Sequence, residues 1–309
     1  MRDSPDVSVV MSVYNGAARV RESIDSVLRQ EGVEFELIIV DDGSTDGSGE
    51  ILEAYAAFDR RVRVVTQENQ GLTRALIRGC AAAKGRCIAR QDAGDLSLPG
   101  RLVKQLECVS QNPDSAFVSC GTRFVGPKEE HLYDVKPQAA EAMTRLLTLE
   151  LRDLAGPSHH GSTMFRRHDY ERVGGYRPDF YFAQDLDLWI RLAETGTHHV
   201  MPEILYQASL DVVSISSLQR KAQIETTKII LESAALRRRG RSEAPALAKA
   251  ALIKPRAKGR SDRLQRARSL YFIGTCLNAR SDPQARSYFR QALRAFPLHF
   301  KSAARLFFG

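Results

Sequence analysis

The segment Phe35-Glu-Leu-Ile-Ile-Val-Asp-Asp-Gly-Ser-Thr-Asp46 joins an apolar run of strand length to a polar turn that is rich in carboxylates. A second apolar run, Val7-Ser-Val-Val-Met-Ser-Val13, precedes it, and residues 19–30 between the two have the apolar spacing of a helix. The same alternation continues to about residue 120, with further segments at 46–58, 61–65, 72–83 and 86–90. This order predicts an α/β fold with a mostly parallel sheet and helices on both of its faces.

The last third of the chain differs from the rest in pattern and in charge. Beyond Val212 only helical spacing occurs, and residues 211–309 carry 21 Lys and Arg against 6 Asp and Glu, a net charge of +15. Residues 1–210 carry 24 against 31, a net charge of −7. We therefore predict an α/β domain of residues 1–210 and an all-helical, basic region of residues 211–309, whose end resembles one tetratricopeptide helix pair.

Composition excludes several classes of protein. Of the 309 residues 43% are hydrophobic and 27% are charged, as in a folded protein with a buried core. No run of about 18 apolar residues is present, and residues 1–6 lack the apolar centre of a signal peptide. The five cysteines are scattered and have no zinc-binding spacing. We expect a cytoplasmic protein with reduced cysteines.

Carboxylates directly follow two of the predicted strands. Asp41 and Asp42 end one strand, and Asp92 and Asp95 follow another. Because ligands of such sheets bind beyond the carboxyl ends of the strands, these side chains are candidates for a shared site. Two carboxylates three residues apart suit a hard divalent cation, which prefers oxygen ligands and often bridges to phosphates. Helix capping is the alternative for both turns, since Asp, Ser and Thr are good N-cap residues.

A third acidic segment lies far downstream, at Phe182-Ala-Gln-Asp-Leu-Asp-Leu-Trp-Ile-Arg191. Its apolar spacing predicts a helix, and Trp189, the only tryptophan, is expected in the core. Asp185 lies near the start of this helix, where the helix dipole stabilises a carboxylate. The alternative is a general base that acts on a hydroxyl group.

The order of five segments is more specific than any one of them. They are 7–15 with Val-Ser-Val-Val-Met-Ser-Val-Tyr-Asn, 40–46 with Val-Asp-Asp-Gly-Ser-Thr-Asp, 69–76 with Asn-Gln-Gly-Leu-Thr-Arg-Ala-Leu, 92–95 with Asp-Ala-Gly-Asp, and 184–189 with Gln-Asp-Leu-Asp-Leu-Trp. In this order they resemble the family 2 glycosyltransferases of the GT-A fold, which has a Rossmann-like sheet. The resemblance covers residues 7 to 206 and leaves the basic helical region outside.

The resemblance implies a binding site for a nucleotide-diphospho-sugar donor. Ser12 and Tyr14 would line the base pocket, Asp42 would hydrogen-bond the nucleobase, and Arg74 would approach the nucleotide. Asp92 matches the first acid of the family's Asp-x-Asp signature, which serves the ribose and the metal-bound diphosphate. A UDP-sugar is favoured, because UDP is the most frequent nucleotide in the family.

The resemblance also implies a divalent cation, Mn²⁺ or Mg²⁺, but the chain departs from the signature at Gly94. Most relatives have there the second acid, which is usually the direct metal ligand. We expect Asp92 and Asp95 to hold the cation more weakly than the relatives do. The departure leaves a second interpretation open, in which the chain is catalytically impaired and keeps the fold as a scaffold or interaction protein.

On the acceptor side, Asp185 matches the acid that deprotonates the acceptor hydroxyl. Gln184 stands where an acid often precedes this base, and Asp187 is expected to replace that charge in part. His160 is expected to line the acceptor pocket together with Gln184 and Asp187. We expect His159 and His160 to shape this pocket rather than to bind metal, because no carboxylate or thiol stands at ligand spacing from them.

These features predict an inverting glycosyltransferase that moves a sugar to a hydroxyl of a glycan or lipid-linked acceptor in cell-surface polysaccharide synthesis. The basic region is interpreted either as a solvated helical surface or as a docking site on the inner face of the cytoplasmic membrane. The docking hypothesis rests on a cluster of cations: Arg237, Arg238, Arg239, Arg241, Lys254, Arg256, Lys258 and Arg260. Nucleic acid is not an expected partner, because the region lacks a recognition motif.

Overall fold

The computed structural model describes residues 4–210, 219–255 and 261–307, and its centre is a mixed, nine-stranded sheet. The strand order is β3-β2-β1-β4-β8-β6-β9-β5, and β7 pairs with β6. The parallel strands expected from the sequence are β1 (Val7–Val13), β2 (Phe35–Asp41), β3 (Val62–Thr66) and β4 (Cys87–Asp92). The others are β5 (Leu96–Ser97), β6 (Ser115–Val125), β7 (His131–Val135), β8 (Thr163–Arg166) and β9 (Thr197–Ser209).

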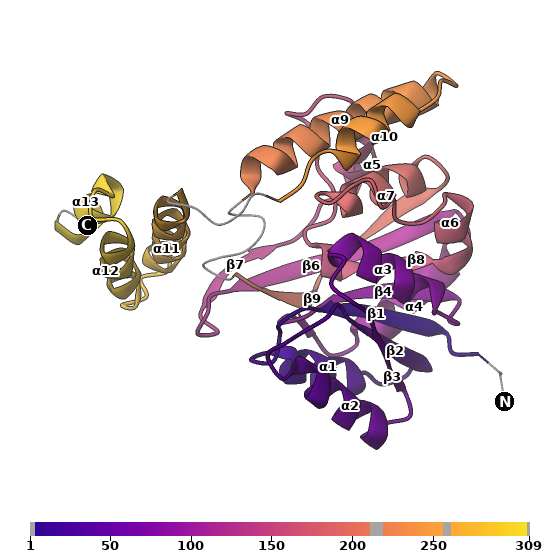
Figure 1. Cartoon of the computed structure of the whole chain (residues 1–309), viewed down its shortest axis with the longest axis horizontal. Coiled ribbons are helices and arrows are strands. Elements are labelled where there is room, and N and C mark those ends of the chain that lie inside the picture. The colour runs from indigo at the N-terminus through magenta and orange to yellow at the C-terminus, as the bar shows by residue number, and fades with distance from the viewer. Residues whose placement is uncertain (1–3, 211–218, 256–260, 308–309) are drawn as a thin grey trace.

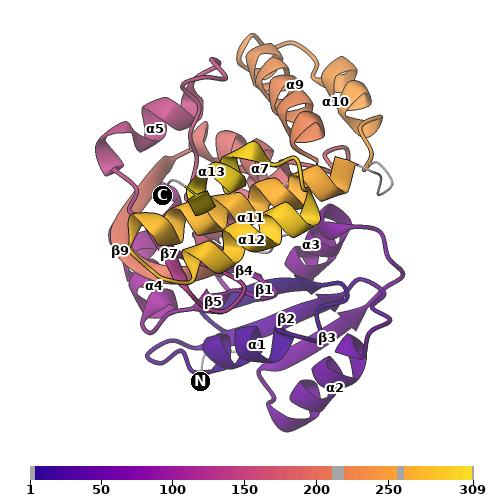
Figure 2. The ribbon, with the colours of Figure 1, turned by 90° about the vertical axis from the view of Figure 1, so that its left-hand side faces the viewer.

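Helices cover both faces of the sheet, because successive residues of a strand point to opposite faces. Val10 and Ile38 belong to one core, which also contains residues of α3 (Leu72–Ala81), α6 (Arg167–Arg172) and α7 (Gln184–Ala193). Val9 and Leu37 belong to the other core, with α1 (Val20–Leu28), α2 (Ser48–Phe58) and α4 (Arg101–Gln111). The predicted α/β architecture is confirmed (Figures 1 and 2).

The strands that follow β4 depart from the simple alternation of the first hundred residues. Residues His160–Ser162 form a short 3-10 helix, η1, so β8 begins only at Thr163. β6 runs antiparallel to β8 and parallel to β9, and both partners lie far downstream of β6 in the sequence. These long-range pairings bring the end of β9 next to the end of β4.

The region beyond residue 218 is helical throughout its described parts, as predicted, but it divides into two packing units. α9 (Arg220–Arg238) and α10 (Ala244–Ala251) share a core with α7, while α5 (Ala139–Leu147) also packs on α7. A separate core joins β7 to α11 (Ser261–Ala279), α12 (Ala285–Ala295) and α13 (Phe300–Phe307). Figures 1 and 2 show α11–α13 beyond the carboxyl ends of β1 and β4. The predicted domain boundary and tetratricopeptide pair stay predictions.

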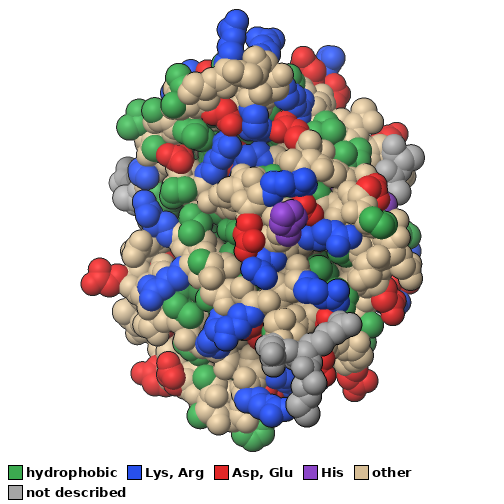
Figure 3. Space-filling view, turned by 90° about the vertical axis from the view of Figure 1, so that its right-hand side faces the viewer, with side chains coloured by type: hydrophobic (Ala, Val, Ile, Leu, Met, Phe, Trp, Pro, Cys, Tyr) green, Lys and Arg blue, Asp and Glu red, His purple; other side chains and the backbone are tan. Residues whose placement is uncertain are grey.

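The surface of the molecule carries both signs of charge on the face drawn in Figure 3, where Lys and Arg side chains are intermingled with Asp and Glu. Across residues 4–210, 219–255 and 261–307, no helix has the length and apolar character needed to cross a bilayer.

Candidate active site

The two carboxylates at the end of β2 have different partners. Asp41 Oδ1 accepts a hydrogen bond from the backbone N–H of Ser44 at 3.0 Å, which closes the turn before α2. Asp42 is 2% exposed, and it accepts hydrogen bonds from the backbone N–H groups of Gln70 at 2.9 Å and Gly71 at 2.8 Å. The Asp42 carboxylate therefore fixes the loop between β3 and α3, and its contact with a nucleobase stays a prediction.

The other predicted donor residues lie at the same edge of the sheet. Ser12 pairs with Val40 on one side and with Asp92 on the other, so β1 ends between the two acidic turns. Tyr14 follows directly and is 55% exposed. Arg74, in the first turn of α3, is exposed and makes no hydrogen bond or ion pair with any residue that the structure describes. Tyr14 and Arg74 are therefore accessible to a ligand, and the donor-binding roles of all three residues stay predictions.

The end of β4 carries a compact cluster of oxygen and nitrogen ligands. His159 Nδ1 lies 3.8 Å from Asp92 Oδ2 and 3.6 Å from Asp95 Oδ2. Asp92, Asp95 and His159 each offer one ligand atom, and these atoms all lie within 4.8 Å of one another. Burial raises the pKa of Asp95 to about 6, and the charge of Asp92 adds to this effect while His159 opposes it. Two carboxylates this close repel each other unless a cation lies between them.

The turn around Gly94 explains how Asp95 reaches this cluster. Gly94 has a φ of +97°, a conformation that other residues rarely adopt, and its N–H donates to Ser23 Oγ at 2.8 Å. Beyond the turn, Asp95 accepts hydrogen bonds from the Tyr206 hydroxyl at 3.0 Å and the Ser209 N–H at 2.9 Å. The same Tyr206 hydroxyl accepts from the Asp92 N–H at 3.1 Å. β9 therefore positions Asp95 against Asp92.

Two fully buried arginines support the cluster from inside the protein. Arg90 Nη2 donates to Asp92 Oδ1 at 2.7 Å, and Arg90 Nε donates to His160 Nε2 at 3.3 Å. Burial and the charge of Arg90 lower the pKa of His160 to about 3, so its imidazole is neutral. The Arg101 guanidinium lies 4.9 Å from the centre of the Tyr206 ring. His160 is only 8% exposed, and its contribution to an acceptor pocket stays a prediction.

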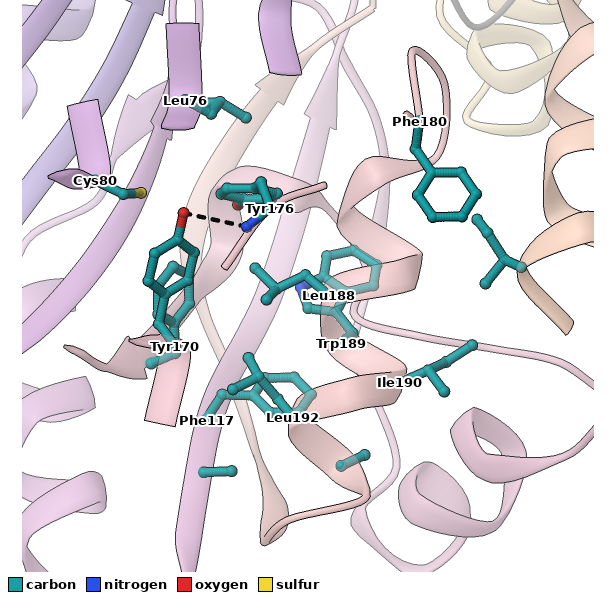
Figure 4. Packing of buried hydrophobic residues seen from close by; sticks show 14 of the residues in the cluster. Leu76, Cys80, Phe117, Tyr170, Tyr176, Phe180, Leu188, Trp189, Ile190 and Leu192 are labelled. Carbon is teal, nitrogen blue, oxygen red and sulfur yellow. Dashed lines mark hydrogen bonds between the residues drawn. The ribbon is translucent and has the colours of Figure 1, made fainter. Parts of the chain in front are cut away.

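α7 brings a third carboxylate toward this edge. The helix is anchored by Leu188, Trp189 and Leu192, which pack among buried aromatic rings (Figure 4), and the prediction of Trp189 as a core residue is confirmed. Asp185 Oδ1 accepts a hydrogen bond from the Leu186 N–H at 2.9 Å. Burial, reinforced by the charge of Asp92, raises the pKa of Asp185. Asp185 and Asp92 therefore lie within electrostatic range of each other.

The two neighbours of Asp185 in the predicted acceptor pocket are both buried. Gln184 is 6% exposed and Asp187 is 2% exposed. Asp187 Oδ2 forms an ion pair with Arg191 at 2.5 Å, and Asp187 Oδ1 lies 3.6 Å from Arg177. This pairing gives Asp187 a structural role, and the places of Gln184 and Asp187 in an acceptor pocket stay predictions.

The sequence and this geometry can be set against known proteins. The profile of the family described as "Glycosyl transferase family 2" matches residues 8–174, more than half of the chain. "Putative glycosyltransferase EpsE" of Bacillus subtilis (strain 168) is 32% identical over 216 residues, which are 68% of this chain and 75% of that protein. The chain belongs to glycosyltransferase family 2. The resemblance expected from the five segments is confirmed, and the protein is an enzyme of this family.

Other relatives of this glycosyltransferase agree with the assignment. "Putative teichuronic acid biosynthesis glycosyltransferase TuaG" of the same strain is 32% identical over 229 residues, 72% of this chain and 86% of that protein. Mannosyltransferase PcManGT from Pyrobaculum calidifontis has been solved with GDP-Man and Mn²⁺. Its structure has a TM-score of 0.57 at 19% identity, and the match covers 99% of this chain and 88% of the PcManGT chain. S. aureus TarS 1–349 has a TM-score of 0.56 at 15% identity, and the match covers 97% of this chain and 89% of the TarS chain. These structural likenesses show the GT-A fold.

The structure changes the premise of two expectations about this glycosyltransferase, and the roles themselves stay predictions. His159 does have carboxylates at ligand distance, because folding brings Asp92 and Asp95 to it from another part of the sequence. The basic cluster is also partly neutralised, since Arg237 Nε contacts Glu194 at 2.6 Å and Arg238 Nε contacts the same carboxylate at 2.7 Å. Arg256, Lys258 and Arg260 lie outside the described residues.

The sequence did not point to three residues that build the site: Arg90, Tyr206 and, as a candidate metal ligand, His159. Only His159 gave a local signal, as one of two adjacent histidines. Arg90 and Tyr206 are fully buried, and nothing in their sequence neighbourhood distinguishes them from ordinary strand residues.

Proposed function

We propose that this glycosyltransferase moves a sugar from a nucleoside diphosphate to a hydroxyl group in one displacement that inverts the anomeric centre. The observation that carries the proposal is the placement of Asp185 at the start of α7, within electrostatic range of Asp92 but on a separate element. Asp92 and Asp95 then serve the diphosphate, and Asp185 serves the incoming hydroxyl. The name of TuaG, which assigns that relative to teichuronic acid biosynthesis, supports an acceptor on a cell-surface polysaccharide or its lipid-linked precursor.

On the donor side, the residues present fit a divalent cation. Asp92, Asp95 and His159 supply two carboxylate oxygens and one imidazole nitrogen, a ligand set that suits Mn²⁺. When bound, such a cation supplies positive charge to the leaving diphosphate. Arg74 supplies a further positive charge from α3, and Ser12, Tyr14 and Asp42 hold the nucleoside.

The donor is proposed to be a UDP-sugar. TarS has been solved with UDP and with UDP-GlcNAc, which supports this choice, while PcManGT has been solved with GDP-Man. Thermal shifts of the full chain with UDP-, GDP- and dTDP-sugars, each with Mn²⁺ or Mg²⁺, identify the donor as the ligand that stabilises the protein most.

On the acceptor side, Asp185 takes the proton of the attacking hydroxyl. Its raised pKa makes the carboxylate a stronger base than an exposed aspartate. The Leu186 N–H occupies Oδ1, which leaves Oδ2 to receive the proton. Negative charge that develops on the leaving phosphate is stabilised on the opposite, donor side of the site.

Asp185→Asn tests this assignment, because the amide keeps the oxygen that accepts from Leu186 and removes the base. We expect turnover with a radiolabelled donor to fall by about 10² or more, the low end of what a general base contributes, with donor affinity nearly unchanged. Asp153→Asn, at an exposed carboxylate, is the matched control and should keep full turnover. Normal turnover of Asp185→Asn contradicts the assignment, and absence of both transfer and donor hydrolysis in the wild type favours the scaffold interpretation.

A further inference from the structure

α11–α13 form a part of the protein in which nearly all charge is of one sign. Residues 261–307 contain nine Lys and Arg against two Asp and no Glu. All nine cations are exposed: Arg263, Arg266, Arg268, Arg280, Arg286, Arg290, Arg294, Lys301 and Arg305. Among the described residues none of these nine has an ion-pair partner. Asp282 is committed to its own turn, where Oδ1 accepts from the Gln284 N–H at 2.8 Å.

The basic cluster that begins at Arg237 differs from α11–α13, because some of its arginines form ion pairs. Arg237 and Arg238 both contact Glu194, and Arg237 also contacts Glu243 at 2.5 Å. These pairs lie between α9, α10 and the end of α7, so they hold the protein together. Of the other cations of that segment that the structure describes, Arg239, Arg241 and Lys254 are exposed and have no ion pair, so α11–α13 carry the larger group of unpaired charge.

The arginines of α12 are arranged as a stripe. Arg286, Arg290 and Arg294 are spaced by four residues, so they share one face of the helix, while Phe289 and Ala292 are buried on the other. Lys301 and Arg305 repeat this spacing on α13. Like charges at this spacing disfavour a helix, and no acidic residue of α12 or α13 offsets them. An anionic partner would remove this repulsion.

Two large apolar side chains accompany the stripe. Leu298 lies in the connection from α12 to α13 and is 65% exposed, and Phe300 opens α13 and is 78% exposed. A single exposed apolar residue is ordinary, but apolar residues beside a cluster of Lys and Arg are typical of segments that lie in a membrane interface. Leucine offers no stacking surface to a nucleic-acid base, so this combination favours lipid.

The unit also stands close to the active site. The Phe272 ring of α11 meets Tyr133 with 6.1 Å between ring centres, Tyr133 stacks on Phe124 at 4.8 Å, and Phe124 meets His159 at 6.1 Å. Leu210, which follows the strand that holds Asp95, packs against the same core as α11 and α12. α11 thus packs on the pair of strands β6 and β7, and Phe124 of this pair contacts His159 of the proposed donor site.

We propose that α11–α13 dock this enzyme on an anionic lipid bilayer, with the cations of α12 and α13 at the headgroups and Leu298 and Phe300 in the interface. The proposal goes beyond the proposed function, because docking needs neither donor nor transfer. If the acceptor is lipid-linked, docking also brings the active site to this substrate. Only this last consequence rests on the proposed function.

Sedimentation of the full chain with vesicles tests the proposal without donor or acceptor. We expect binding to vesicles of phosphatidylcholine with phosphatidylglycerol, little binding to phosphatidylcholine alone, and weaker binding at high salt. Since each basic residue at such a surface contributes roughly fivefold, the triple variant Arg286→Gln, Arg290→Gln, Arg294→Gln should lose about 100-fold in partitioning. Leu298→Ser with Phe300→Ser should remove the binding that survives high salt.

A matched control separates this surface from net charge. The triple variant Arg21→Gln, Arg60→Gln, Arg78→Gln removes the same charge from exposed sites on the α/β domain and should bind like the wild type. Melting curves establish that each variant is folded. Equal binding to neutral and anionic vesicles overturns the proposal, as does wild-type binding by the α12 variant. Tight binding of duplex DNA through the α12 arginines, without preference for anionic vesicles, overturns it in favour of nucleic acid.

Discussion

Replacing Glu243 by Gln tests how α9 and α10 are held against the rest of the enzyme. The Glu243 carboxylate, 15% exposed, accepts hydrogen bonds from Arg177 at 2.8 Å and Ser233 at 2.5 Å and pairs with Arg237. Burial raises the pKa of Glu243, but these partners outweigh it and lower the pKa from 4.5 to about 2. At about 1.4 kcal/mol for each pKa unit, the ionised carboxylate stabilises the fold by about 3 kcal/mol at pH 7.

The sign of the pH dependence follows from the direction of this shift. A carboxyl group whose pKa is lower in the folded state stabilises the protein fully above its unfolded pKa of 4.5, and this contribution is lost as the pH falls toward 2. The difference in unfolding free energy between the wild type and Glu243→Gln should therefore be full at pH 7 and roughly half as large at pH 3.

Urea unfolding, followed by the fluorescence of the single buried Trp189, measures the effect. Trp189 lies on α7, which contacts α9, so it reports on the element that Glu243 helps to hold. With a denaturant slope of roughly 3 kcal/mol per molar, Glu243→Gln should lower the urea midpoint at pH 7 by about 1 M. Glu225→Gln, at an exposed position of α9, should leave it unchanged. Equal midpoints for Glu243→Gln and the wild type would refute the reasoning.

Two further predictions concern the cluster at the end of β4. His159→Ala removes the only nitrogen ligand, and we expect Mn²⁺ affinity measured by calorimetry to fall by about tenfold or more, whereas unchanged affinity argues against His159 as a ligand. A Cβ at Gly161 would lie 1.9 Å from the hydroxyl of the buried Tyr206, so Gly161→Ala should destabilise the protein by about 1–3 kcal/mol and weaken Mn²⁺ binding as Tyr206 leaves Asp95. A melting temperature equal to that of the wild type contradicts the second prediction.

Local patterns in the sequence are enough to predict the parallel half of the sheet and the ends of its strands. Apolar runs separated by helical spacing predict β1, β2 and β4, and the carboxyl ends of parallel strands meet at one edge. Ser12, Asp42 and Asp92 could therefore be assigned to one edge from local pattern alone. The helical nature of the described parts beyond residue 218 was also predictable, most clearly for α12 and α13, whose apolar residues gather on one face.

Long-range contacts, which appear only in the folded chain, determine which side chains meet at that edge and which charges remain unpaired. His159 and Tyr206 reach Asp95 through β8 and β9, whose pairings join residues far apart in the chain and leave no periodic trace in the sequence. Arg237 is a second example. In the sequence it belongs to a cluster of basic residues, but in the folded chain it forms an ion pair with Glu194. A composition records how many charges a chain has, but their availability depends on contacts that only folding creates.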